Sequence, residues 1–139
     1  MLAGVKIPSE SGLVAHSDGD VLIHAVMDAI LSASGLRDIG FYFPDKNAEF
    51  KDANSMVLLA KVMQMITDKG YAVQNISVAV QAEKPRLAPY IEQMQNSLAS
   101  ALKIDPTAVG ITAGTNEGLG YIGEGKGITV NAYVLLYKK

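Results

Sequence analysis

The sequence has no cysteine and no tryptophan, and its 139 residues carry little net charge, with 12 Lys and Arg against 14 Asp and Glu. The absence of cysteine excludes disulfides, thiolate nucleophiles and cysteine-based zinc sites. No apolar run reaches the roughly 18 residues that span a bilayer, so we expect no membrane partner. A net charge of −2 offers no basic surface for a phosphate backbone, so we expect no nucleic-acid partner.

What remains is an ordinary globular composition, in which hydrophobic residues make up 49% and charged residues 19% of the chain. The length predicts a single domain over residues 1–139. Residues 1–15 include Lys6, Pro8 and Glu10 and do not have the pattern of a signal peptide. We therefore expect a soluble protein of the cytoplasm, or of a plastid-like compartment in a plastid-bearing organism.

Hydrophobic periodicity predicts three helices and three strands, which follow a short extended segment at the N-terminus. The expected helices cover residues 21–34, 54–68 and 90–102, and the expected strands cover residues 76–82, 109–113 and 128–136. Asp20 is a candidate helix cap, and Gly35 and Gly70 are the expected terminators of the first two helices. This order predicts an α/β (α+β) two-layer sandwich, with helices on one face of a small mixed sheet.

Two glycine patterns near the C-terminus imitate phosphate-binding loops. Residues 118–123 match G-x-G-x-x-G, and residues 120–126 match G-x-x-x-x-G-K. Both loops must open a helix to hold a phosphate at its N-terminus, and here a strand is expected to follow. We therefore interpret the segment as a glycine turn between strands.

Polar residues recur at one-turn spacing in the first expected helix. Asp20, His24 and Asp28 stand at i, i+4 and i+8, so they line one side of it. Histidine is a frequent metal ligand, and a neighbouring carboxylate can orient its ring. The spacing alone favours the simpler alternative, a capped helix with a solvated polar stripe. His16 stands just before the helix, where an anionic ligand is favoured.

Two strand ends carry further candidate residues. Thr115, Asn116 and Glu117 follow a strand, and the carboxylate suits a hard cation such as magnesium. The segment 82–88 ends another strand and brings two cations, Lys84 and Arg86. The alternative for Thr115, Asn116 and Glu117 is an Asx-type turn with an exposed acid. The alternative for the segment 82–88 is a solvated corner.

Together these segments resemble the 2-C-methyl-D-erythritol 2,4-cyclodiphosphate synthases. The similarity rests on the block from His16 to Asp45, which fits in order and spacing, and continues through residues 85–91 and 117–121. It implies a ferredoxin-like homotrimer with active sites between subunits. It also implies the reaction, in which 4-diphosphocytidyl-2-C-methyl-D-erythritol 2-phosphate closes to the cyclic diphosphate and releases CMP.

The resemblance also implies a role for each matching residue. His16 and Thr115 would stabilise the transition state, His24 would bind zinc, and Glu117 would bind a magnesium or manganese ion. The implied substrate-binding residues are His16, Ser17, Asp38, Ile39, Gly40, Phe43, Pro44, Asp45, Lys46, Asn47, Ala82, Lys84, Pro85, Arg86, Leu87, Ala88, Gly114, Thr115, Asn116, Glu117 and Tyr121. Among these, Asp38 and Gly40 would bind the erythritol or ribose end, and the segment 82–88 would hold the cytidine, largely through its backbone.

The zinc site implied by the resemblance is incomplete in this sequence. The family takes its other two zinc ligands from an Asp-x-His pair on a first strand, and residues 1–5 match the region after that strand. Catalytic zinc usually has three protein ligands. We therefore expect the 139-residue chain to hold zinc weakly.

The alternative functions are a non-catalytic trimer that binds cytidine nucleotides, and a plain structural assembly domain.

The carboxylate of Glu117 gives a direct test of the implied enzyme. Glu117→Gln keeps the shape and removes the charge, so we expect a large loss of CMP release. We expect little change in thermal stability, because substitutions outside the core are usually mild. Turnover and the melting temperature of the two proteins measure this, and unchanged turnover would leave Glu117 as a turn residue.

Overall fold

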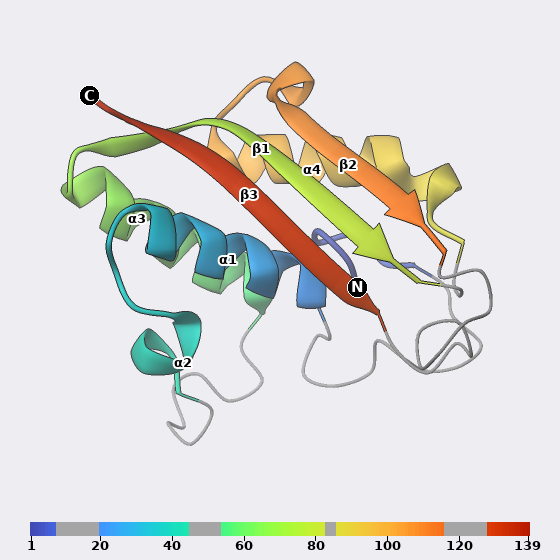
Figure 1. Ribbon diagram of the computed structural model, residues 1–139, viewed down its shortest axis with the longest axis horizontal. Coiled ribbons are helices and arrows are strands. Elements are labelled where there is room, and N and C mark those ends of the chain that lie inside the picture. Colours follow the sequence, from blue (N-terminus) through green and yellow to red (C-terminus); the bar gives the residue numbers. More distant parts are fainter. Residues whose placement is uncertain (8–19, 45–53, 83–85, 116–127) are drawn as a thin grey trace.

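The computed structural model describes residues 1–7, 20–44, 54–82, 86–115 and 128–139 (Figure 1). Its strands form one mixed sheet in the order β2-β1-β3. The central strand β1 (Tyr71–Gln81) pairs in parallel with β2 (Val109–Gly114) and antiparallel with β3 (Thr129–Lys138). The chain passes from β1 to β2 through a helix, as a parallel pair requires.

Three helices, α1 (Val21–Ala33), α3 (Ser55–Asp68) and α4 (Ile91–Leu102), cover one face of this sheet (Figure 1). Their apolar stripes form the core together with the strands. The largest fully buried side chains are Leu2, Leu22, Ile23, Met27, Ile30, Leu31, Leu59, Ile66, Met94, Leu98 and Leu102. The predicted two-layer α+β class is confirmed. No helix in the described part of the chain has the length and apolar character needed to cross a membrane.

The strands alternate between the two faces of the sheet as predicted. In β1, Val78 and Val80 are buried against the helices, whereas Ser77 is exposed. In β3, the side chains from Val130 to Leu136 at every second position are half-buried, and those between them are exposed. The exposed row ends in Tyr133, Leu135 and Tyr137, which places large apolar side chains on the face opposite the three helices.

Caps and glycines set the helix ends where the sequence predicts them. Asp20 caps α1, and Asn54 caps α3 by accepting a hydrogen bond from the Met56 amide at 2.8 Å. After α1, Gly35 has φ +80° and the amide of Leu36 donates to the Leu31 carbonyl at 2.8 Å. This left-handed residue closes the helix and turns the chain away from it.

Two elements differ from the prediction. β1 begins at Tyr71 rather than Ile76, because a bulge between Val73 and Asn75 interrupts the alternation that the prediction uses. A four-residue helix, α2 (Ile39–Tyr42), lies in the stretch after α1 where no element was predicted. It is too short to show a hydrophobic period. Two 3₁₀ turns, Ala88–Tyr90 and Pro106–Ala108, precede α4 and β2.

The N-terminal segment is a tight turn, so the predicted extended conformation is wrong for residues 2–5. Leu2 and Val5 form a bridge with two backbone hydrogen bonds of 2.9 Å. Ala3 and Gly4 make the reversal at φ 52° and 76°, a conformation that is unfavourable for alanine. Leu2 and Ala3 are nevertheless fully buried, so something in the fold must stabilise this turn.

The stabilising group is the carboxylate of Asp20, which is 1% exposed. It accepts hydrogen bonds from the amides of Ala3 at 2.9 Å, Gly4 at 2.7 Å and Ile23 at 3.1 Å. The third bond is the N-cap of α1, and the first two hold the N-terminal turn. One buried carboxylate therefore joins the start of α1 to the N-terminal turn, whose Ala3 and Gly4 precede Asp20 by 17 and 16 residues.

Replacing Asp20 with alanine should destabilise the protein strongly. The substitution removes an N-cap and leaves buried amides unpaired, so we expect a loss of about 2–4 kcal/mol in the free energy of unfolding. Chemical denaturation measures this loss. Asn54→Ala is the matched control, because it removes one exposed cap bond and should cost about 1 kcal/mol. Equal losses in the two variants would contradict the role given to Asp20.

Candidate active site

The parallel strands β1 and β2 end at the same edge of the sheet. Their pairing runs from Ile76 and Val109 to Gln81 and Gly114, and the Ala82 amide continues it by donating to the Gly114 carbonyl at 3.0 Å. The segments that follow the two strands therefore start side by side. This is the usual location of ligand sites in sheets with parallel strands.

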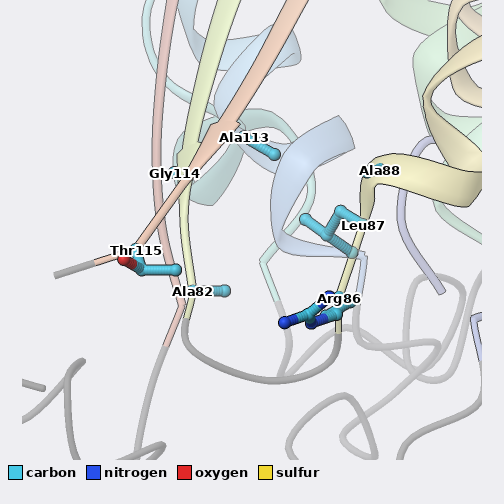
Figure 2. Close-up of a pocket in the computed structure, with 7 residues that line it drawn as sticks. All are labelled: Ala82, Arg86, Leu87, Ala88, Ala113, Gly114 and Thr115. Carbon is cyan, nitrogen blue, oxygen red and sulfur yellow. The ribbon is translucent and has the colours of Figure 1, made fainter. Parts of the chain in front are cut away.

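A pocket of ≈ 320 Å³ opens at this edge (Figure 2). Its volume is at the lower end of the range for small-molecule sites. Its lining residues are Ala82, Arg86, Leu87, Ala88, Ala113, Gly114 and Thr115. Three alanine methyl groups and the buried Leu87 give it small apolar walls, and the backbone of both strand ends supplies polar groups.

One cation and one hydroxyl border the pocket. The guanidinium of the exposed Arg86 points toward Ala82 across the opening (Figure 2). Thr115 lies directly after β2, on the opposite side of the opening (Figure 2). An apolar chamber with a positive charge at its opening is suited to a flat ring that carries an anionic group.

The structure brings six of the predicted residues to this pocket from two distant segments: Ala82, Arg86, Leu87, Ala88, Gly114 and Thr115. Ala113 also lines the pocket but was not among the predicted site residues, although strand alternation could have placed it on this face. Ala113 stands two residues after Ile111, so its side chain is on the helix-covered face of the sheet.

Ten predicted site residues lie outside the described part of the chain. They are His16, Ser17, Asp45, Lys46, Asn47, Lys84, Pro85, Asn116, Glu117 and Tyr121. The two glycine patterns within residues 118–126 also lie outside it.

Asp20, His24 and Asp28 each bond to a different segment. Asp20 caps α1 as predicted but is buried, whereas Asp28 is exposed, so the predicted polar stripe is only partly solvated. Asp20 holds the N-terminal turn, and the His24 ring shares a hydrogen bond of 3.1 Å between its Nε2 and Ser55 Oγ. Asp28 accepts from the Ile39 amide at 2.9 Å. Because Asp20 and Asp28 bond to backbone amides and Ser55 bonds to the His24 ring, the proposed carboxylate orientation of the ring is not observed.

The predicted residues from Asp38 to Pro44 follow α1 in the chain, lie in and around α2, and do not line the pocket (Figure 1). Asp38 caps α2, and its Oδ1 accepts from the Phe41 amide at 3.1 Å. Ile39 and Phe43 pack against the core, and Gly40 is exposed. Within one chain, the two predicted parts of the site are separate.

The described residues do not fit a zinc ion on their own. No group of three His, Cys, Asp or Glu side chains within them is placed to hold a metal. His24 is the one predicted ligand that the structure describes, and its Nε2 is bonded to Ser55. One imidazole does not make up the three-ligand set of a catalytic zinc.

The sequence pattern of the YgbB family matches residues 1–137 of the chain. The chain belongs to the YgbB family. A relative from Neisseria gonorrhoeae is 51% identical, and one from Alkaliphilus oremlandii is 46% identical, each over 99% of this chain. The matches cover 86% and 88% of those relatives. Both are named 2-C-methyl-D-erythritol 2,4-cyclodiphosphate synthase, so the resemblance predicted from the motifs is confirmed.

A solved structure of a 2C-methyl-D-erythritol-2,4-cyclodiphosphate synthase in its CDP-bound form has the same fold as this chain. It superposes on this chain with a TM-score of 0.88 at 34% identity, over 99% of this chain and 89% of that one. The agreement in fold extends over nearly the whole chain. The pocket at the ends of β1 and β2 therefore belongs to a fold that binds a cytidine nucleotide in that relative.

Proposed function

We propose that this chain converts 4-diphosphocytidyl-2-C-methyl-D-erythritol 2-phosphate into 2-C-methyl-D-erythritol 2,4-cyclodiphosphate and CMP. One observation carries the proposal: the pocket at the ends of β1 and β2, in a chain 46–51% identical to enzymes named for this product. The pocket unites Ala82 and residues 86–88 with Gly114 and Thr115, which the sequence motifs assign to the substrate.

The reaction is an intramolecular phosphoryl transfer. An oxygen of the 2-phosphate attacks the β-phosphorus in line, and a new P–O bond closes the ring. The bond from the β-phosphorus to the bridging oxygen breaks, and CMP leaves with that oxygen and its negative charge. Because the substrate supplies the nucleophile, the protein has to position both phosphates and neutralise the charge that develops.

The residues around the pocket suit the nucleotide end of this substrate. The small walls formed by Ala82, Ala88 and Ala113 leave room for a cytosine ring, and the backbone after β1 offers hydrogen-bonding groups to its edge. Arg86 places a positive charge at the opening, where the phosphates leave the pocket. Thr115 is proposed to stabilise the transition state together with His16.

The proposed metal ligands are His24 and Glu117. A zinc ion held by His24 and a magnesium or manganese ion held by Glu117 would polarise the phosphates. The described residues do not complete a zinc site. Asp38 and Gly40 are proposed to bind the erythritol or ribose end of the substrate.

The separation of the two parts of the site supports an assembly in which neighbouring subunits combine them. We propose a homotrimer, and the sheet face opposite the three helices supports it, because Tyr133, Leu135 and Tyr137 are 70%, 59% and 46% exposed there. Large apolar patches of this kind mark interaction surfaces.

The test of the proposed function is product formation. The purified chain is incubated with the substrate and divalent ions, and CMP and the cyclic diphosphate are quantified by chromatography and ³¹P NMR. The proposal predicts the two products in equal amounts. Binding of CDP without release of CMP would contradict it and would favour the non-catalytic nucleotide-binding trimer.

The test of the assembly is sedimentation at micromolar concentration. The wild-type chain is expected at about three times its mass of 14.7 kDa. Leu135→Asp puts a charge into the apolar row and should shift the protein toward monomers, with the fold retained by circular dichroism. Gln93→Asp makes the same charge change on an exposed position of α4 and should leave the trimer intact. A monomeric wild type would contradict the proposal.

A further inference from the structure

Asp28 lies on the exposed side of α1, and its carboxylate bonds to a residue that follows this helix in the chain. Its Oδ1 accepts a hydrogen bond from the backbone amide of Ile39 at 2.9 Å, across 11 residues. Ile39 is the first residue of α2. The bond therefore fixes the start of α2 against the side of α1.

The short helix needs such an external anchor. Isolated helices of fewer than about 12 residues are marginal in water, and α2 has four. Ile39, Tyr42 and Phe43 pack against the core and supply the apolar part of the anchor. The bond from Asp28 supplies a polar part, at the amide that directly follows Asp38.

The turn around α2 is bonded internally, so it should respond to that anchor as one unit. Asp38 Oδ1 accepts from the Phe41 amide at 3.1 Å, and the Arg37 amide donates to the Tyr42 hydroxyl at 3.3 Å. The Arg37 guanidinium also lies 4.6 Å from the centre of the Phe41 ring. A displacement of the Ile39 amide would therefore change the direction of the Asp38 carboxylate.

We infer that Asp28 is a positioning residue for the reaction. It holds the Ile39 amide, and through it the orientation of Asp38 and Gly40 toward the erythritol or ribose end of the substrate, without contacting the substrate itself. The inference rests on the proposed function, which assigns Asp38 and Gly40 to the substrate.

Three variants separate the hydrogen bond from charge and from general stability. Asp28→Ala removes the acceptor, whereas Asp28→Asn keeps an oxygen that can accept from the Ile39 amide. Asp68→Ala is the matched control, because Asp68 is an exposed helical carboxylate that accepts from the Gln64 side chain on α3. The measurements are amide hydrogen exchange at Ile39, and the KM and kcat for CMP release.

For Asp28→Ala we expect faster exchange at Ile39 and a KM raised about three- to tenfold, the factor that a net hydrogen bond contributes. The kcat should stay within about twofold, since the loss is in substrate binding. Asp28→Asn and Asp68→Ala should behave as the wild type.

The inference is overturned if KM is unchanged in Asp28→Ala, or if Asp28→Asn is as impaired as the alanine variant. A wild-type chain that releases no CMP would refute the proposed function and this inference with it. An active wild type with an unaffected Asp28→Ala variant would refute the inference alone.

Discussion

The buried carboxylate of Asp20 is the interaction on which the arrangement of this chain depends. It caps α1 and at the same time bonds two amides of a turn in which an alanine has positive φ. Gly4 is needed in that turn, because a Cβ there would meet Met56 Sδ at 3.0 Å. The start of α1 is thereby fixed to the N-terminal turn, and everything bonded along α1 is fixed with it.

Two further residues at one-turn spacing extend this constraint along α1. His24 bonds to Ser55 at the start of α3, and Asp28 bonds to Ile39 at the start of α2. Side chains four residues apart stand above one another on a helix, so one edge of α1 aligns the starts of three segments. The pocket at the ends of β1 and β2 is formed independently of this edge, by the paired strand ends. The proposed site therefore combines two parts of the fold that are held in place by different interactions.

The helices, the strand faces and the family were predictable from the sequence, because periodicity, caps and an ordered motif block are local signals. The glycines after α1 and α3 end those helices as predicted. The cap at Asp20 was predictable, but its bonds to the N-terminal turn and the partners of His24 and Asp28 were not, since the spacing gives the face they share and not the segments that meet it. Likewise, α2 is too short for a period, and the turn at Ala3 depends on a carboxylate 17 residues away.

The central claim is that the pocket between the ends of β1 and β2 holds the cytidine end of the substrate. A crystal structure of the chain with CDP tests it most directly. The account predicts the cytosine ring between Ala82, Ala88 and Ala113, against the backbone of residues 82–88, with the diphosphate leaving past Arg86. A nucleotide bound elsewhere on the chain, with this pocket empty, would contradict it.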